Sequence, residues 1–139
     1  MPFMLTEGDL FVAARTVWGE ARGESQEARI AVAHVMVNRV REEKGQFKQD
    51  VTLAGACTRS RQFSCWNPED PNFGEMARVD LNSPEFRNCM AAVLKAVDSK
   101  TDPTFGSRHY HASYASPSWA EGHSAVAKSG NHFFYNSIL

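Results

Sequence analysis

The carboxyl group of Glu20 is the strongest candidate for acid–base chemistry in the sequence, and it lies in the run WGEARGE at residues 18–24. A carboxyl group protonates a poorly basic leaving oxygen, such as that of a glycosidic bond, when a partly apolar setting raises its pKa. Trp18 lies nearby, and Glu20 is expected in the last turn of a helix, whose partial negative charge disfavours an ionised carboxylate. Both effects predict a raised pKa, although a glutamate in such a turn is ordinarily just surface charge.

The helix that would position Glu20 is expected from about Glu7 to Arg22. Thr6 and Asp9 resemble a capping box at its start, with aspartate in place of the usual glutamate. Gly23 is expected to end the helix, because glycine accepts the left-handed conformation that closes many helices. The apolar stripe of this helix follows helical spacing and consists of Leu10, Ala14, Val17 and Ala21.

A second helix is expected from Gln26 to about Glu43, with Ser25 as its N-cap. Its centre is apolar on nearly every side, which predicts a central helix surrounded by the rest of the fold. A buried strand is the alternative because of the valines, but the length and the helix-favouring flanks favour a helix. His34 and Asn38 are expected as hydrogen-bonded core groups rather than ligands.

The remaining segments predict shorter elements. Ser83 and Pro84 supply an N-cap and a first-turn proline. In chain order we expect a loosely structured excursion from Gly45 to Pro84 with one short helix near Asp50 to Cys57, a helix ending near Ser99, and strands around Arg108 to Ala112 and Asn131 to Asn136 that could pair. The predicted fold class is α+β and mostly helical, with residues 1–139 forming one domain.

Composition and charge exclude several classes of protein. Apolar residues make up 42% of the chain and charged residues 22%, as in ordinary globular proteins, and no apolar run is long enough to cross a membrane. The formal net charge of -1 leaves no broad basic surface for nucleic acid. Residues 1–7 lack the basic start and apolar core of a signal peptide. We therefore expect a chain that is not exported by the general secretory route.

The three cysteines, Cys57, Cys65 and Cys89, are an odd number, which excludes a complete disulfide framework within one chain. Cys57 and Cys65 could pair in an oxidising compartment, but three reduced, part-buried thiols fit better. Their spacing is not that of a metal site.

Seven segments recur in the order of a known family: ARTVWGEARGE (14–24), AVAHVMVNRV (31–40), RQFSCW (61–66), DPT (102–104), HYH (109–111), PSWA (117–120) and HFFY (132–135). Together they resemble the SleB-type cell-wall hydrolases, which include spore cortex-lytic enzymes and related phage and bacterial lysins. The resemblance spans nearly the whole chain, and ordered matches are far more specific than any one of them.

This resemblance implies a lysozyme-like fold whose functional acid is the first glutamate of GEARGE, here Glu20. The implied reaction cleaves the β-1,4 bond between N-acetylmuramic acid (MurNAc) and N-acetylglucosamine (GlcNAc) in peptidoglycan, and we expect no cofactor or metal. We also expect the protein to be a monomer. As a lytic transglycosylase, Glu20 would protonate the leaving oxygen and then deprotonate the sugar's 6-hydroxyl, closing a 1,6-anhydro ring. That reaction needs neither water nor a second carboxylate.

Hydrolysis is the alternative, and it needs a second carboxylate at roughly 5 to 9.5 Å across the scissile bond. Glu24 is the nearest candidate in sequence, but Gly23 is expected to break the helix between the two glutamates, and capping or structural charge is the simpler expectation. The sequence does not rank the remaining candidates, Glu69, Asp70 and Asp80.

A glycan groove also needs aromatic faces, amides and hydroxyls. The expected substrate-binding residues are Gln62, Phe63, Ser64, Tyr110 and Trp119, and the family match favours Gln62, Phe63 and Tyr110 over Trp119 and the further candidate Trp66. Each aromatic could instead fill the core. Arg22 and Arg108 could meet acidic stem peptides or the muramyl lactyl group, although isolated arginines are more often solvated or salt-bridged.

Two other classes stay open. His109 and His111 share one face of an extended segment, and His123 or His132 could complete a zinc site, which would make the protein a wall amidase. A non-catalytic glycan-binding or virion component would not require an acid at Glu20. Whether the substrate is spore cortex or vegetative wall is not encoded in any residue singled out above. With no signal peptide expected, a lysin of this family would be cytoplasmic until it is released to the periplasm or cell wall by a holin or another non-Sec route, and a cytoplasmic or separately packaged enzyme fits equally well.

Overall fold

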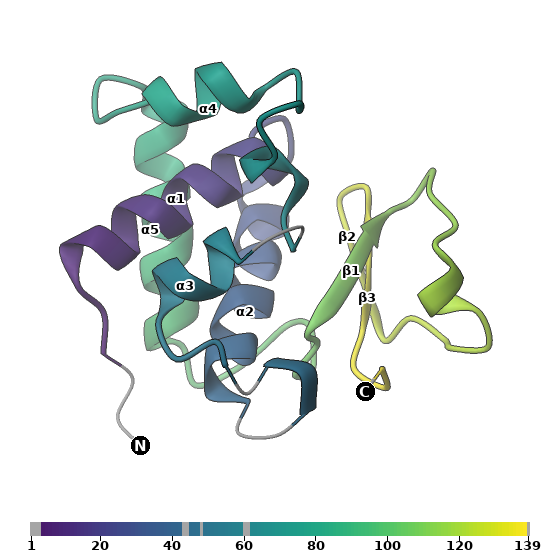
Figure 1. Ribbon diagram of the computed structural model, residues 1–139. Helices are drawn as coiled ribbons and strands as arrows, with labels where there is room; N and C mark the ends of the chain where they lie inside the picture. The colour runs from purple at the N-terminus through teal and green to yellow at the C-terminus, as the bar shows by residue number, and fades with distance from the viewer. Residues whose placement is uncertain (1–3, 43–44, 48, 60–61, 139) are drawn as a thin grey trace.

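The computed structural model describes residues 4–42, 45–47, 49–59 and 62–138. Figure 1 shows a helical part with a small sheet beside it. The elements are α1 (Glu7–Ala21), α2 (Gln26–Arg41), η1 (Gly45–Phe47), α3 (Leu53–Thr58), η2 (Ser64–Trp66), α4 (Phe73–Arg78), α5 (Pro84–Asp98), β1 (His109–Ala112), η3 (Ser118–Ala120), β2 (Ala127–Ser129) and β3 (His132–Tyr135). The expectation of a mostly helical α+β fold is confirmed.

Helix α1 begins as predicted and ends differently. The Thr6 side chain accepts from the backbone N–H of Asp9, and the Asp9 carboxylate accepts from that of Thr6, so the capping box is confirmed. The prediction that Gly23 closes the helix in a left-handed conformation is wrong, because Gly23 is not among the described residues of positive φ. Instead, the Arg29 side chain donates to the last carbonyl groups, those of Ala21 and Arg22. A side-chain donor thus replaces the glycine cap.

Helix α2 forms the centre of the helical part, as expected. Its residues from Ala31 to Val37 are all buried, and α1 and α5 pack against it. The predicted end at Glu43 lies outside the described residues, and the helix ends at Arg41. Asn38 donates to the Asp102 carboxylate at 2.8 Å, which confirms its hydrogen-bonded structural role. His34 is buried, with Nδ1 3.6 Å from the same carboxylate.

The excursion from Gly45 to Pro84 holds more structure than predicted. The short helix α3 lies close to its expected position, whereas α4 and the two single turns η1 and η2 were not predicted. Ser83 caps α5 and Pro84 opens it, as expected. Within the described residues, no helix is long and apolar enough to cross a membrane.

The sheet has the order β1-β3-β2, with both pairs antiparallel, and β2 was not predicted. Tyr110 of β1 lies opposite Phe134 of β3, which belongs to the hydrophobic core. Because side chains alternate along a strand, His109 and His111 lie on the other face of the sheet. The sheet thereby carries Tyr110 toward the helices, and we call this its inner face.

All three cysteines are free and buried, in agreement with the expectation of reduced thiols. Burial raises the pKa of the Cys57 thiol to about 12 and that of Cys89 to about 11. Burial also raises the pKa of the Cys65 thiol, and the nearby Glu20 carboxylate raises it further.

Candidate active site

Glu20 lies in the last turn of α1, where its Oε1 accepts a hydrogen bond of 2.5 Å from the Tyr110 hydroxyl. Burial of the carboxyl group raises its pKa. Hydrogen bonds from Tyr110 and from Cys65 oppose this effect, the charge of Asp70 adds to it, and the pKa stays above its ordinary value. Glu20 therefore remains protonated to a higher pH than a surface glutamate, as a general acid requires.

Burial raises the pKa of Glu20 as the sequence led us to expect, but the groups that contact its carboxyl are not the one named from the sequence. Trp18 is two residues away and points to another side of α1, where its ring packs 4.3 Å from the Arg22 guanidinium. The groups that contact the Glu20 carboxyl come instead from β1 and η2, namely the Tyr110 hydroxyl and Cys65. The predicted apolar setting exists, but distant parts of the chain supply it.

Tyr110 reaches Glu20 because the inner face of the sheet packs on the helical part. Its ring lies 5.8 Å from that of Phe134 and 5.1 Å from that of His132 between centroids. Burial raises the pKa of the Tyr110 hydroxyl well above its ordinary value, and the Glu20 charge raises it further. The hydroxyl thus keeps its proton and donates it in a hydrogen bond to Glu20.

Gly19 lets η2 approach the end of α1. A Cβ added at Gly19 would lie 2.6 Å from the Cβ and 2.9 Å from the Sγ of Cys65, closer than real contacts allow. The Trp66 indole N–H holds the same turn by donating to the Thr16 hydroxyl at 2.8 Å. Sequence reasoning missed Gly19, although a glycine inside a helix costs stability and signals a close approach. It considered Trp66 only as a candidate for sugar contact, whereas the structure gives its indole N–H this positioning contact.

The turn η2 and the residues just before it also bring three predicted substrate-binding residues toward the site. Phe63 is buried, its ring centroid lies 6.4 Å from that of Tyr110, and the Arg39 guanidinium lies 4.8 Å from it on the core side. Gln62 is half-buried and Ser64 is exposed. Phe63 therefore has a packing role, and sugar contact by these three residues stays a prediction.

Trp119 is not brought together with Glu20. It lies in η3, where its ring packs 5.4 Å from His109, 5.6 Å from His111 and 5.4 Å from Tyr135 between centroids. These partners are on the outer face of the sheet, away from Tyr110. The strand alternation that directs Tyr110 to the site directs its two histidine neighbours away from it.

Glu24 contacts the turn between β2 and β3. Its Oε1 accepts from the backbone N–H of Asn131 at 3.1 Å and lies 3.8 Å from His132 Nδ1. A Cβ at Gly130 in that turn would lie 2.7 Å from Glu24 Oε2. These contacts support a structural role for Glu24. Of the three other acids that the sequence left unranked, Asp70 is the one whose charge acts on Glu20.

Replacing Glu24 by alanine is expected to lower the free energy of unfolding by about 1 kcal/mol, because the Asn131 amide loses a charge-assisted hydrogen bond. Glu24→Gln keeps an acceptor and should lose less, and both variants should retain turnover within about threefold of wild type. Urea denaturation and wall digestion measure the two effects. Loss of turnover in a stably folded Glu24→Gln would show that the charge takes part in the chemistry.

The histidines and arginines make separate contacts. His111 Nε2 lies 2.8 Å from the Tyr135 hydroxyl, His123 Nδ1 lies 2.8 Å from Ser137 Oγ, and His132 lies on the inner face of the sheet. No three metal-ligating side chains within the described residues converge on one point. Arg108 pairs with Glu42 at 2.8 Å, and Arg22 donates to the Asn72 side chain.

Two solved structures share this fold over nearly its whole length. The catalytic domain of the Bacillus cereus SleB protein is 26% identical, with a TM-score of 0.76, and the match covers 98% of this chain and 95% of that one. The catalytic domain of the germination-specific lytic transglycosylase SleB from Bacillus anthracis is 26% identical, with a TM-score of 0.73, and the match covers 98% and 100%. None of the curated proteins compared matches the chain.

The lysozyme-like fold together with these matches defines a cell-wall lytic enzyme. Residues 23–135 match the family model described as Cell Wall Hydrolase, and the chain belongs to that family. The resemblance to SleB-type hydrolases is thereby confirmed. Glu20 precedes the matched residues, so its role rests on the geometry of the site.

Proposed function

We propose that this enzyme cleaves the MurNAc–GlcNAc β-1,4 bond of peptidoglycan as a lytic transglycosylase, with Glu20 as its single acid and base. The observation that carries the proposal is the desolvated Glu20 carboxyl group, which has a raised pKa and accepts a hydrogen bond from Tyr110. The Glu24 carboxylate is engaged by the β2–β3 turn. The Bacillus anthracis relative, described as a lytic transglycosylase, supports the same reaction class.

In this reaction Glu20 changes its protonation state twice. Its raised pKa keeps the carboxyl group protonated, so that it can transfer its proton to the departing glycosidic oxygen. The resulting carboxylate is stabilised by the Tyr110 hydroxyl and by hydrogen bonds from Cys65, and it then takes the proton of the sugar's 6-hydroxyl. That oxygen attacks the anomeric carbon and closes the 1,6-anhydro ring, which returns Glu20 to its starting state.

Mass analysis of digested peptidoglycan tests this proposal. We expect MurNAc ends that are lighter by one water than hydrolysed ends. Reducing ends would show hydrolysis, for which Asp70 is the carboxylate to examine, because its charge acts on Glu20. Freed stem peptides would show an amidase, and binding without products would show a glycan-binding module. Spore cortex and vegetative wall should both be digested to identify the preferred substrate.

Replacing Tyr110 by phenylalanine should move the alkaline limb of the pH–rate profile to higher pH. The hydroxyl lowers the pKa of Glu20, so its loss raises that pKa, and the acid stays protonated further into the alkaline range. Turnover at its maximum should fall by about tenfold, since the Glu20 carboxylate loses one charge-assisted hydrogen bond. The profile is measured between about pH 4 and pH 9. An alkaline limb that does not move would show that the Tyr110 hydroxyl does not set the pKa of the catalytic acid.

A further inference from the structure

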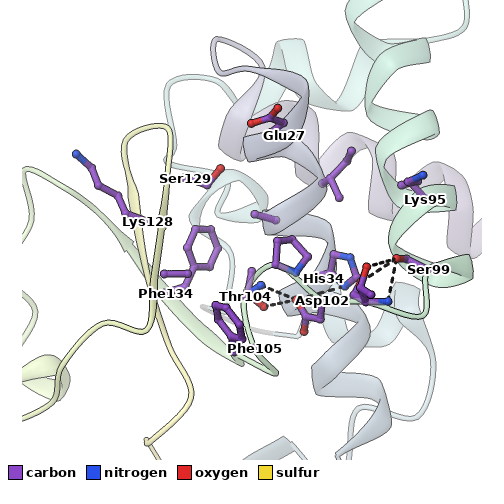
Figure 2. A pocket seen from close by; sticks show the side chains of 15 residues that line it. Glu27, His34, Lys95, Ser99, Asp102, Thr104, Phe105, Lys128, Ser129 and Phe134 are labelled. Atoms are coloured by element: carbon purple, nitrogen blue, oxygen red, sulfur yellow. Dashed lines mark hydrogen bonds and ion pairs between the residues drawn. The ribbon is translucent and has the colours of Figure 1, made fainter.

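A cavity of about 560 Å³ lies apart from Glu20, where α2, the end of α5 and the inner face of the sheet meet (Figure 2). Ile30 and Ala31 of α2 and Ala127 and Phe134 of the sheet supply apolar wall. The loop at residues 101–105 closes another side. The hydroxyl-bearing residues Ser99, Thr101 and Ser129 also line the cavity.

Phe134 separates this cavity from the proposed active site. Its ring is completely buried, contributes to the cavity wall and lies 5.8 Å from the Tyr110 ring between centroids. Glu20 itself is not among the lining residues. The cavity is therefore distinct from the proposed active site. The Phe134 ring contacts both, because it lines the cavity and packs on Tyr110.

Phe105 is an exposed aromatic residue in this lining, and the fold holds it in a costly conformation. Its φ is 55°, and 65% of its surface is accessible. The Asp102 carboxylate accepts from the backbone N–H of Gly106, and the Asn136 side chain donates to the Phe105 carbonyl. A strained backbone that exposes an aromatic ring beside a cavity points to ligand contact.

Two opposite charges line the cavity, from different helices. Lys95 of α5 and Glu27 of α2 are both exposed, and neither has an ion-pair partner within the described residues. Figure 2 shows them on separate parts of the lining. Lys128 also lines the cavity, but its ammonium lies 5.5 Å from the Phe133 ring on the outer face of the sheet. Lys95 and Glu27 are thus an exposed cation and an exposed anion of this lining that no ion pair among the described residues occupies.

Two further titratable side chains line the cavity, His34, which is buried, and Asp102, which is half-buried. Burial lowers the pKa of His34, so the imidazole is neutral near pH 7. Burial raises the pKa of Asp102, but hydrogen bonds from Thr104, Asn38 and Gly106 hold it below its ordinary value. Its carboxylate is occupied by these donors and shapes the loop.

We propose that this cavity binds the stem peptide of peptidoglycan, an inference that rests on the substrate proposed above. Stem peptides carry alanine methyl groups, carboxylates and the amino group of a diamino acid. The methyl groups fit the apolar wall, a carboxylate pairs with Lys95, and the amino group pairs with Glu27. An uncharged glycan would form no ion pair with Lys95 or Glu27. A purely apolar ligand would leave both charges unpaired next to its surface.

Binding of a free stem tetrapeptide to the wild-type enzyme tests the proposal without turnover, since the peptide has no glycosidic bond. Heteronuclear NMR should show shifts at Ile30, Ser129 and Phe134, and Lys95→Glu should weaken binding by at least about fivefold. Lys100→Glu makes the same charge change outside the lining and should leave affinity within about twofold. The result is independent of whether Glu20 acts as the catalyst.

Phe105→Gly separates ligand contact from a structural role. Glycine accepts positive φ, so the variant should unfold at the same or higher denaturant concentration while its affinity for the tetrapeptide falls. Absence of peptide-induced shifts at the cavity, or equal loss of affinity in Lys95→Glu and Lys100→Glu, would overturn the proposal. Shifts at Ile30 and Ser129 caused by a peptide-free glycan chain would overturn it as well, whereas Phe134, which packs on Tyr110, is left out of this comparison.

Discussion

Replacing Glu20 by glutamine is expected to lower the rate of wall cleavage by at least about 1,000-fold, since one carboxyl group serves as both acid and base. Glutamine has the same shape but neither gives up nor accepts the proton that the reaction moves. The Tyr110 hydroxyl cannot take over the role of the Glu20 carboxyl as the proton donor, because its pKa is raised well above its ordinary range. Release of soluble muropeptides from purified wall, followed over time, measures the loss.

The variant should fold and still bind wall. The glutamine carbonyl can accept a hydrogen bond from the Tyr110 hydroxyl as the carboxylate does. A neutral amide also has no charged form whose burial would cost free energy, as burial does for the Glu20 carboxylate. Glu24→Gln is the matched control, because it changes the other glutamate of the same motif. A Glu20→Gln variant that folds and keeps more than about a tenth of the rate would contradict the single-acid mechanism.

The elements that the sequence predicted well are those with local signals. The Thr6–Asp9 capping box, the Ser25 cap and the Ser83–Pro84 pair all mark helix starts within a few residues of chain, and each helix begins where its signal stands. The apolar run of α2 identified the central helix because only a surrounded helix is apolar on all sides.

The active-site geometry was less predictable because it depends on long-range packing. The hydroxyl that contacts Glu20 is 90 residues away in the chain, and the turn that brings Cys65 to it lies in an excursion without periodic pattern. The end of α1 was mispredicted for the same reason, since its cap is the Arg29 side chain of the next helix. Trp119 carried the residue type of a sugar contact, but the sheet directs it elsewhere.

Replacing Gly19 by alanine is expected to lower both stability and turnover, although alanine is the better helix former by about 1 kcal/mol. The new Cβ would lie 2.6 Å from Cys65 Cβ, 2.9 Å from its Sγ and 3.3 Å from Met76 Cγ. Cys65 is buried, so η2 must move away from α1 as a unit. We expect a net loss of about 1–3 kcal/mol in urea denaturation and about tenfold in turnover, because Cys65 also contacts Glu20.

Two further variants distinguish this clash from a general effect of adding a methyl group. Gly23→Ala, four residues on, meets nothing within 4 Å and has no positive φ, so it should be neutral or stabilising by up to about 1 kcal/mol. Adding Cys65→Gly to Gly19→Ala removes both of the closest atoms and should recover part of the lost free energy of unfolding, whereas adding Cys65→Ala leaves the Cβ contact and should not. Equal rescue by both would show that the sulfur alone, and not the approach of the two backbones, limits this position.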